Sequence, residues 1–175
     1  MALSFYRQIV DHYYSQYGIE VTPRIKEIYQ FILDRMPSDP IDVSELENTL
    51  MKDEDADKTF YCDFDVFKNI YQVNLRSVRR SMKARVLVLL TLVDTSNELT
   101  NSSIQEESAI LKQVISSSLR KNDIFSKFNV SQYSLIVASP HLEGAKKAVE
   151  RIEERYQAKK KHQTMILQTE LKTID

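Results

Sequence analysis

The sequence predicts an α+β fold from residue 86 onward, with the element order β-α-β-β-α-β of a ferredoxin-like half-open sandwich. The first observation is residues 85–93, RVLVLLTLV, which are nearly all apolar and partly β-branched, as in a strand covered on both faces. The second is residues 123–138, which have the pattern of strand, tight turn and strand. The third is MILQTELKTI, whose alternation puts Met165, Leu167 and Leu171 on one side of a strand with one wet face.

The helices of this fold follow from apolar residues spaced three and four apart. Ser103 and Glu106 are expected to form a capping box at the start of the first, which bears Ile104, Leu111, Val114, Ile115 and Leu119. Ser139 and Pro140 are expected to start the second, which bears Leu142, Ala145, Val149, Ile152 and Tyr156. A long helix in the segment from Phe60 precedes the first strand, with an apolar face of Phe64, Phe67, Ile70, Tyr71, Val78 and Met82.

The N-terminal third predicts a separate helical part. Residues 1–36 are expected to form a helical hairpin, because Gly18 suits the left-handed position after a first helix, and Thr22 with Pro23 suits the start of a second. Residues 37–58 are expected to be a linker with an acidic run, KDEDADK, and a short helix around residues 43–51. Residues 59–175 then make up the α+β domain.

Composition excludes several classes of function. The net charge is −1 and the pI about 6.3, so we expect no direct contact with nucleic acid. An arginine-rich face beginning at Arg76 is expected to be a solvated helix face, the alternative being a contact with DNA phosphates. No apolar run reaches the ~20 residues of a membrane span and no signal peptide is present. A single cysteine, Cys62, fits a reducing cytoplasm, which is the expected location.

The two glycines of the chain set a further limit. Loops that wrap backbone amides around phosphate groups need several glycines, so GxGxxG and Walker A motifs are excluded. A GxSxG nucleophile elbow is excluded by the same count. His12, His141 and His162 lie in different predicted elements without partners at metal-ligand spacing, so we expect no metal site, no cofactor and no catalytic residue.

Residues 120–137, RKNDIFSKFNVSQYSLIV, resemble the signature hairpin of the GGDEF (diguanylate cyclase) family. In that family the hairpin runs R-x-x-D, five residues, then G-G-D-E-F and an apolar strand. The spacing is retained here, but the five signature places hold Asn129, Val130, Ser131, Gln132 and Tyr133. The runs NLRSVRRSMKARVLVLLTLVD and ILKQVISSSLRKND are similar to the lead-in helix with first strand and to the second helix of the family.

The resemblance implies a domain without cyclase activity. Active members hold two metal ions with carboxylates at the end of the first strand and in the signature turn. Here the turn carries no anionic side chain, and Asp94 is the one carboxylate near the other ligand position. The guanine-contacting Asp of the family falls near Ser108. We therefore expect a degenerate domain that is not an enzyme.

One family feature is retained, because Arg120 and Asp123 match the R-x-x-D inhibitory site. In that site the Arg grips a phosphate or guanine of cyclic di-GMP and the Asp supports it. The alternative is that Arg120 is a solvated surface residue and Asp123 only begins a strand. If the resemblance extends to function, a cyclic dinucleotide or another nucleotide is the expected ligand.

Residues 13–33, YYSQYGIEVTPRIKEIYQFIL, are similar to the closing helices of the bacterial transcriptional activator domain, a TPR-like array of SARP-type regulators. The stretch from Gly18 to Arg24 resembles the family's G-V-x-P-S-x-x-L break, with Ile25 or Ile28 in the role of its Leu. This resemblance implies a non-catalytic interaction or signal-receiving module of a transcriptional regulator. Its expected partners are an upstream DNA-binding domain and a second copy of the chain.

Overall fold

The computed structural model describes residues 59–81, 85–139 and 141–174, without the side chains of residues 78–81, and single positions between Arg24 and Glu47. The chain divides into two compact units, Met1–Asp57 and Lys58–Asp175. In the first unit, the described helical positions agree with the predicted second and short helices: Arg24, Glu27, Ile28, Gln30, Phe31, Val43, Ser44 and Glu47. The predicted helix at residues 2–17 lies outside the described residues.

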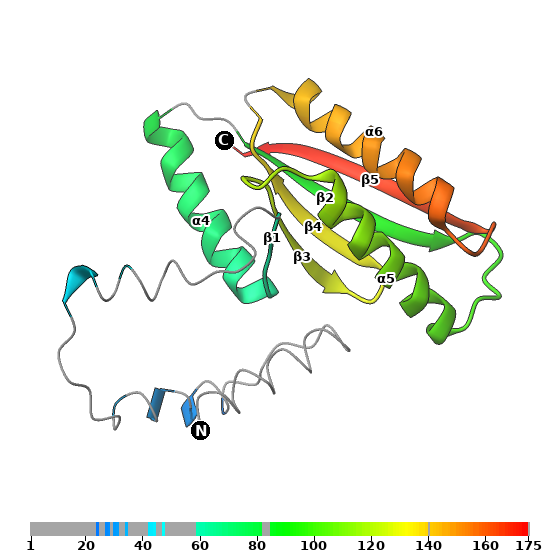
Figure 1. The fold of residues 1–175 in the computed structure, drawn as a ribbon, viewed down its shortest axis with the longest axis horizontal. Coiled ribbons are helices and arrows are strands. Elements are labelled where there is room, and N and C mark those ends of the chain that lie inside the picture. Colours follow the sequence, from blue (N-terminus) through cyan, green and yellow to red (C-terminus); the bar gives the residue numbers. More distant parts are fainter. Residues whose placement is uncertain are drawn as a thin grey trace. The chain divides into compact units, whose positions relative to one another are not determined.

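The second unit is built on one five-stranded sheet with the strand order β1-β3-β4-β2-β5 (Figure 1). The strands are β1 (Phe60–Tyr61), β2 (Arg85–Asp94), β3 (Ile124–Asn129), β4 (Gln132–Val137) and β5 (Met165–Ile174). β2 pairs antiparallel with both β4 and β5, and β3 pairs antiparallel with β4. The four long strands have the ferredoxin-like arrangement, which confirms the predicted α+β fold.

Three helices cover this sheet: α4 (Phe64–Ser81), α5 (Asn101–Ser118) and α6 (Leu142–Lys159). Figure 1 shows α5 and α6 next to each other along the sheet and α4 apart from them. On the α5–α6 face the alternate residues Val86, Val88, Leu90 and Leu92 of β2 are buried, as expected for a strand covered on both faces.

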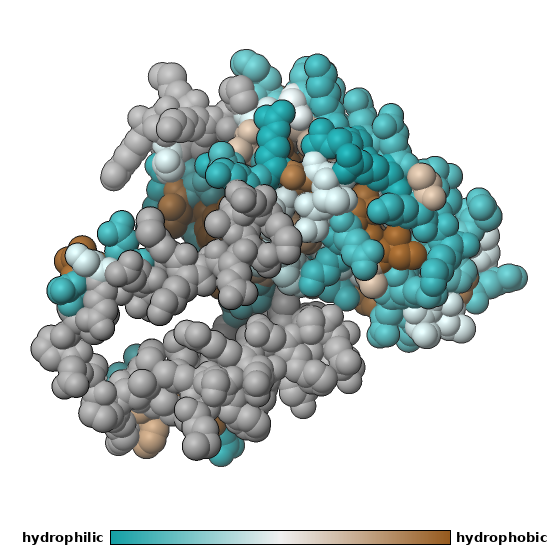
Figure 2. Space-filling model, viewed as in Figure 1, coloured by the Kyte–Doolittle hydropathy of each residue, from teal (hydrophilic) through white to brown (hydrophobic). Residues whose placement is uncertain are grey.

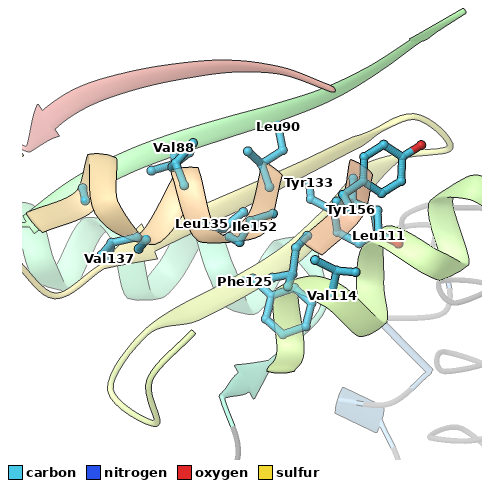
Figure 3. Close-up of a cluster of buried hydrophobic side chains, with 14 of the residues drawn as sticks. Val88, Leu90, Leu111, Val114, Phe125, Tyr133, Leu135, Val137, Ile152 and Tyr156 are labelled. Atoms are coloured by element: carbon cyan, nitrogen blue, oxygen red, sulfur yellow. The ribbon is translucent and has the colours of Figure 1, made fainter. Parts of the chain in front are cut away.

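The main core lies between the sheet and the pair α5 and α6. Figure 3 shows Leu111 and Val114 of α5, Ile152 and Tyr156 of α6, and strand residues such as Leu135 pointing toward one another. Each large apolar side chain buried in this way contributes roughly 1.5–3 kcal/mol to folding. The outer sides of these helices are mostly hydrophilic, and brown hydrophobic side chains lie between them in Figure 2.

A smaller core lies on the other face of the sheet, under α4. Phe67 and Cys62 are buried there with Ile136 of β4 and Ile174 of β5. Phe64, Ile70, Tyr71 and Leu75 pack against this cluster, which confirms the predicted apolar face of the helix as far as its side chains are described. Burial, with a contribution from the charge of Asp63, raises the pKa of the Cys62 thiol to about 12, so the thiol behaves as a small core residue.

Three details of the sequence prediction are wrong. Phe60 and Tyr61 form a short strand parallel to β3, where two residues are too few to show a period. The N-cap of α5 is Thr100, whose hydroxyl accepts a hydrogen bond from the Ser103 amide, so the helix begins one turn earlier than a Ser103 cap requires. α6 begins at Leu142 after His141, because the Ser139 hydroxyl donates to the His141 carbonyl group instead of capping the helix.

Candidate functional site

The end of β2 lies beside the turn between β3 and β4, as the catalytic arrangement of a cyclase requires. Thr91 is the register partner of Gln132, and the Leu92 amide donates to the Ser131 carbonyl group at 2.8 Å. Asp94, the last residue of β2, therefore lies at the same end of the sheet as the degenerate signature turn. The fold brings together the two chain segments that carry metal ligands in the resembled family.

The side chains of the signature turn bind one another. The Asn129 carbonyl oxygen accepts from the Ser131 amide at 2.9 Å and from the Ser131 hydroxyl at 3.2 Å. The Asn129 side-chain nitrogen donates to Gln132 Oε1 at 2.6 Å, and Gln132 Nε2 donates to the Thr91 hydroxyl at 3.0 Å. This closed set of neutral amides and hydroxyls holds the turn but offers no anionic oxygen to a cation.

Asp94 organises the loop that follows it. One carboxylate oxygen accepts from the Ser96 amide and hydroxyl, and the other accepts from the amides of Glu98 and Leu99 at 2.9 and 3.0 Å. Desolvation works to raise the pKa of Asp94, but these hydrogen bonds outweigh it and hold the pKa well below its usual range. Asn97 takes the left-handed conformation (φ 56°) that the loop needs. The carboxylate therefore serves as the hub of its own loop.

The predicted guanine-recognition position is also a packing position. Ser108 is fully buried, its hydroxyl lies 3.2 Å from the Tyr133 hydroxyl, and its carbonyl group accepts from that hydroxyl at 3.0 Å. Burial raises the pKa of Tyr133 to about 12, although the bond to Ser108 lowers it slightly. The site for a nucleobase is thus filled by a tyrosine from the fifth signature place.

The neighbouring Glu107 is a buried carboxylate that the sequence analysis did not single out. Its oxygens accept from the Tyr156 hydroxyl at 2.7 Å and from the amides of Lys161 and His162 at 2.8 Å. His162 Nδ1 lies 2.9 Å away. Burial works to raise the pKa of Glu107, but these hydrogen bonds lower it overall. Glu107 therefore ties α5 to the segment between α6 and β5.

At the opposite end of the sheet, Arg120 and Asp123 line a cavity of about 210 Å³, here called the Arg120 cavity. Three cationic side chains line it, Arg120, Lys147 and Arg151, against the one carboxylate of Asp123. The remaining lining residues are Val137, Ala138, Ser139, Gly144 and Ala148. Arg120 is exposed and its guanidinium makes no hydrogen bond or ion pair with the described residues. The cavity therefore presents cationic groups to solvent.

Asp123 positions this loop from beneath. The side chain is 2 % exposed, and its oxygens accept from the Arg120 amide at 2.9 Å and from the Ala138 amide at 2.8 Å. The first bond closes the turn that carries Arg120, and the second joins the start of β3 to the end of β4. The structure thus brings the two predicted site residues together, with Asp123 holding the backbone of Arg120.

Lys147 and Arg151 are the members of the cavity that sequence reasoning missed. Both come from α6, where Gly144, Lys147, Ala148 and Arg151 share one helical face at spacings of three and four. Arg151 Nε donates to the Ser118 carbonyl group at 2.9 Å, which anchors it at the end of α5. The spacing on α6 was a usable signal, but only packing shows that this face meets the Arg120 turn.

The remaining candidates from the sequence carry no site. His141 caps α6 and His162 pairs with Glu107, while His12 lies outside the described residues. Within the described part of the chain, no group of three or more His, Cys, Asp or Glu side chains is placed to hold a metal ion. No helix in that part is long and apolar enough to cross a membrane.

The fold has known relatives although the sequence has none. The chain matches no known protein family and no curated protein. Its structure is similar to that of a DGC protein from Thermotoga maritima, with a TM-score of 0.54 at 10% identity over 69% of this chain and 88% of that one. It is also similar to the GGDEF domain of PA1120 from Pseudomonas aeruginosa, with a TM-score of 0.53 at 12% identity over 63% and 74% of the two chains.

A third similar structure is the diguanylate cyclase SiaD, solved in complex with its activator SiaC from Pseudomonas aeruginosa. The TM-score is 0.56 at 12% identity, and the match covers 86% of this chain and 57% of that one. At these identities the likeness concerns the fold. The chain thus contains a domain with the fold of GGDEF diguanylate cyclase domains, as the hairpin at residues 120–137 predicted.

Proposed function

We propose that the unit Lys58–Asp175 is a catalytically inactive, cyclase-shaped domain that acts by binding, as a signal-receiving or interaction module. The observation that carries this proposal is the hydrogen bonding at the end of β2. Asp94 has both oxygens engaged by its own loop, and the turn of Asn129, Ser131 and Gln132 bonds to itself. Two divalent ions bound to a triphosphate need several anionic ligands, which these residues do not supply.

The test is an assay for cyclic dinucleotide formation from GTP with Mg²⁺ or Mn²⁺, with an active diguanylate cyclase as the positive control. We expect no product above the level of a protein-free reaction. Product that disappears in Asp94→Ala, while Asp65→Ala retains it, would overturn the proposal. Asp65 is a matched control because it is a partly exposed carboxylate on α4, away from the turn.

A second candidate function, an anionic nucleotide receptor, is favoured by the Arg120 cavity. Three cationic groups around one cavity attract a phosphate group, and an Arg fork binds phosphate or a guanine edge with two hydrogen bonds. Arg120 is ready for this role because Asp123 holds its backbone and its guanidinium is exposed. Cyclic di-GMP is the expected ligand from the resemblance, and GTP is the comparison.

Thermal unfolding with and without each nucleotide tests this candidate. A ligand at one hundred times its dissociation constant adds about 2.7 kcal/mol of stability, which is a shift of several degrees. Arg120→Ala should abolish the shift, whereas Lys121→Ala should keep it, since Lys121 is exposed next to Arg120 but does not line the cavity. Equal shifts in both variants, or none in the wild type, would count against a receptor.

The role in transcription rests on residues 13–33, which resemble the closing helices of the bacterial transcriptional activator domain. On this basis we propose that the chain works within a regulator, through self-association or contact with a DNA-binding part. Sedimentation equilibrium checks the first route, with a dimer as the expected result. A monomer at all concentrations would leave contact with the DNA-binding part as the remaining route.

A further inference from the structure

A second cavity lies on the opposite face of the sheet from α5 and α6. It has a volume of about 320 Å³, within the roughly 300–1,000 Å³ of small-molecule sites. None of its lining residues belongs to the Arg120 cavity. Its walls are apolar side chains of α4, β2 and β3, chiefly Phe64, Phe67, Tyr71, Leu87, Leu89 and Phe128.

This cavity exists because one helix covers this face of the sheet, where the other face has two. α4 packs its aromatic side chains over Ile136 and Ile174 but leaves Leu87 and Leu89 of β2 only partly buried. Phe128, which is 45% exposed, stands at the side of the cavity with its ring 4.9 Å from that of Phe64. The result is an apolar hollow with an aromatic rim.

One polar group in this apolar wall has no counterpart. Ser134 of β4 lines the cavity and is 7% exposed, and its hydroxyl has no hydrogen-bond partner among the described residues. Its cross-strand neighbour Leu89 offers only an apolar side chain. A buried hydroxyl without a partner is costly, so such groups in native proteins are uncommon and point to a missing partner.

We propose that this cavity binds a small aromatic or branched alkyl molecule with one hydrogen-bonding group, which pairs with the Ser134 hydroxyl. The body of the ligand fills the space between Tyr71, Leu89 and Phe128, and its polar group satisfies the one unpaired hydroxyl of the wall. Lys68 also lines the cavity, but its ammonium group already pairs with Asp65 at 3.3 Å. A neutral ligand therefore fits better than an acid. Binding here is independent of the proposed loss of cyclase activity.

Two probes of equal size test the proposal on the full chain: 1-naphthol, which carries a hydroxyl group, and 1-methylnaphthalene, which does not. Binding is followed by the amide chemical shifts of Leu87, Leu89 and Ser134. We expect saturable binding of both probes, with 1-naphthol bound roughly fivefold more tightly, as one net hydrogen bond provides. Ser134→Ala should remove this difference while leaving the thermal midpoint of the free protein unchanged or raised.

A pair of exposed phenylalanines supplies the control. Phe128→Ala should weaken both probes, whereas Phe60→Ala should weaken neither, because Phe60 is similarly exposed (42%) on β1 but does not line the cavity. Absence of saturable binding would overturn the proposal, as it would if another part of the chain filled the cavity. An unchanged preference for 1-naphthol in Ser134→Ala, or equal effects of Phe128→Ala and Phe60→Ala, would also overturn it.

Discussion

The two ends of the sheet spend their polar residues in different ways. At the end where β2 stops, Asp94, the signature turn and Glu107 bond to the protein's own backbone and side chains. At the other end, Arg120, Lys147 and Arg151 line a cavity, and Arg120 has no ion pair with the described residues. Polar groups used internally stabilise the fold, whereas cations facing a cavity remain available to a ligand. The comparison indicates that catalysis was lost at one end and that binding is to be sought at the other.

The largest effect on stability is expected from Glu107→Gln. An amide cannot accept all the bonds of this buried carboxylate, and its nitrogen would face the amides of Lys161 and His162. We expect a loss of about 2–4 kcal/mol in the free energy of unfolding, measured by denaturant titration. Glu106→Gln is the matched control, because the exposed Glu106 pairs with Lys161 on the surface and should cost well under about 1 kcal/mol. Equal losses would refute the hub role of Glu107.

Asp123→Ala should come next, at about 1–3 kcal/mol, because two backbone amides lose their acceptor. The same variant should weaken any nucleotide effect at the Arg120 cavity, since the turn that carries Arg120 is no longer closed. Asn122→Ala, one residue away and exposed, should change neither property. A fully stable Asp123→Ala protein would place Asp123 outside the structural role derived above.

Stability should also fall in acid, and the turn end is responsible. The pKa values of Asp94 and Glu107 are lowered in the folded protein, so both carboxylates contribute stability above their unfolded pKa. That contribution is lost as the pH falls below roughly 4.5 through the folded pKa values. Thermal midpoints between pH 7 and pH 3 should therefore decline, and the decline should be shallower in Asp94→Asn and in Glu107→Gln. A parallel decline in all three proteins would assign the acid sensitivity to other groups.

The smallest effect is expected from Asn129→Ala in the signature turn, at about 0.5–1.5 kcal/mol. The turn is partly exposed, so water can replace the bonds to Ser131 and Gln132. Nucleotide-induced stabilisation should be the same as in the wild type. A nucleotide effect that disappears in Asn129→Ala but survives in Arg120→Ala would reverse the comparison and move the binding site to the turn end.

Local sequence patterns predicted most of the elements. The run at residues 85–93 and the alternation at Met165–Ile174 report strands, because a residue's exposure in a strand follows from its neighbours two positions away. Boundaries were less well predicted. Thr100 and Ser103 are both good caps, and choosing between them depends on where the loop held by Asp94 ends. The two-residue strand β1 exists only through its pairing with β3.

The sequence by itself determined the order of the elements and the absence of anionic side chains at Asn129, Val130, Ser131 and Gln132, because both are properties of the chain read in order. Tertiary structure alone decided which side chains meet. Lys147 and Arg151 reach the Arg120 turn because α6 packs across the sheet in one rotation, and Ser134 faces an apolar cavity because a single helix covers its face. Such convergence depends on strand register and helix packing, which involve residues far apart along the chain.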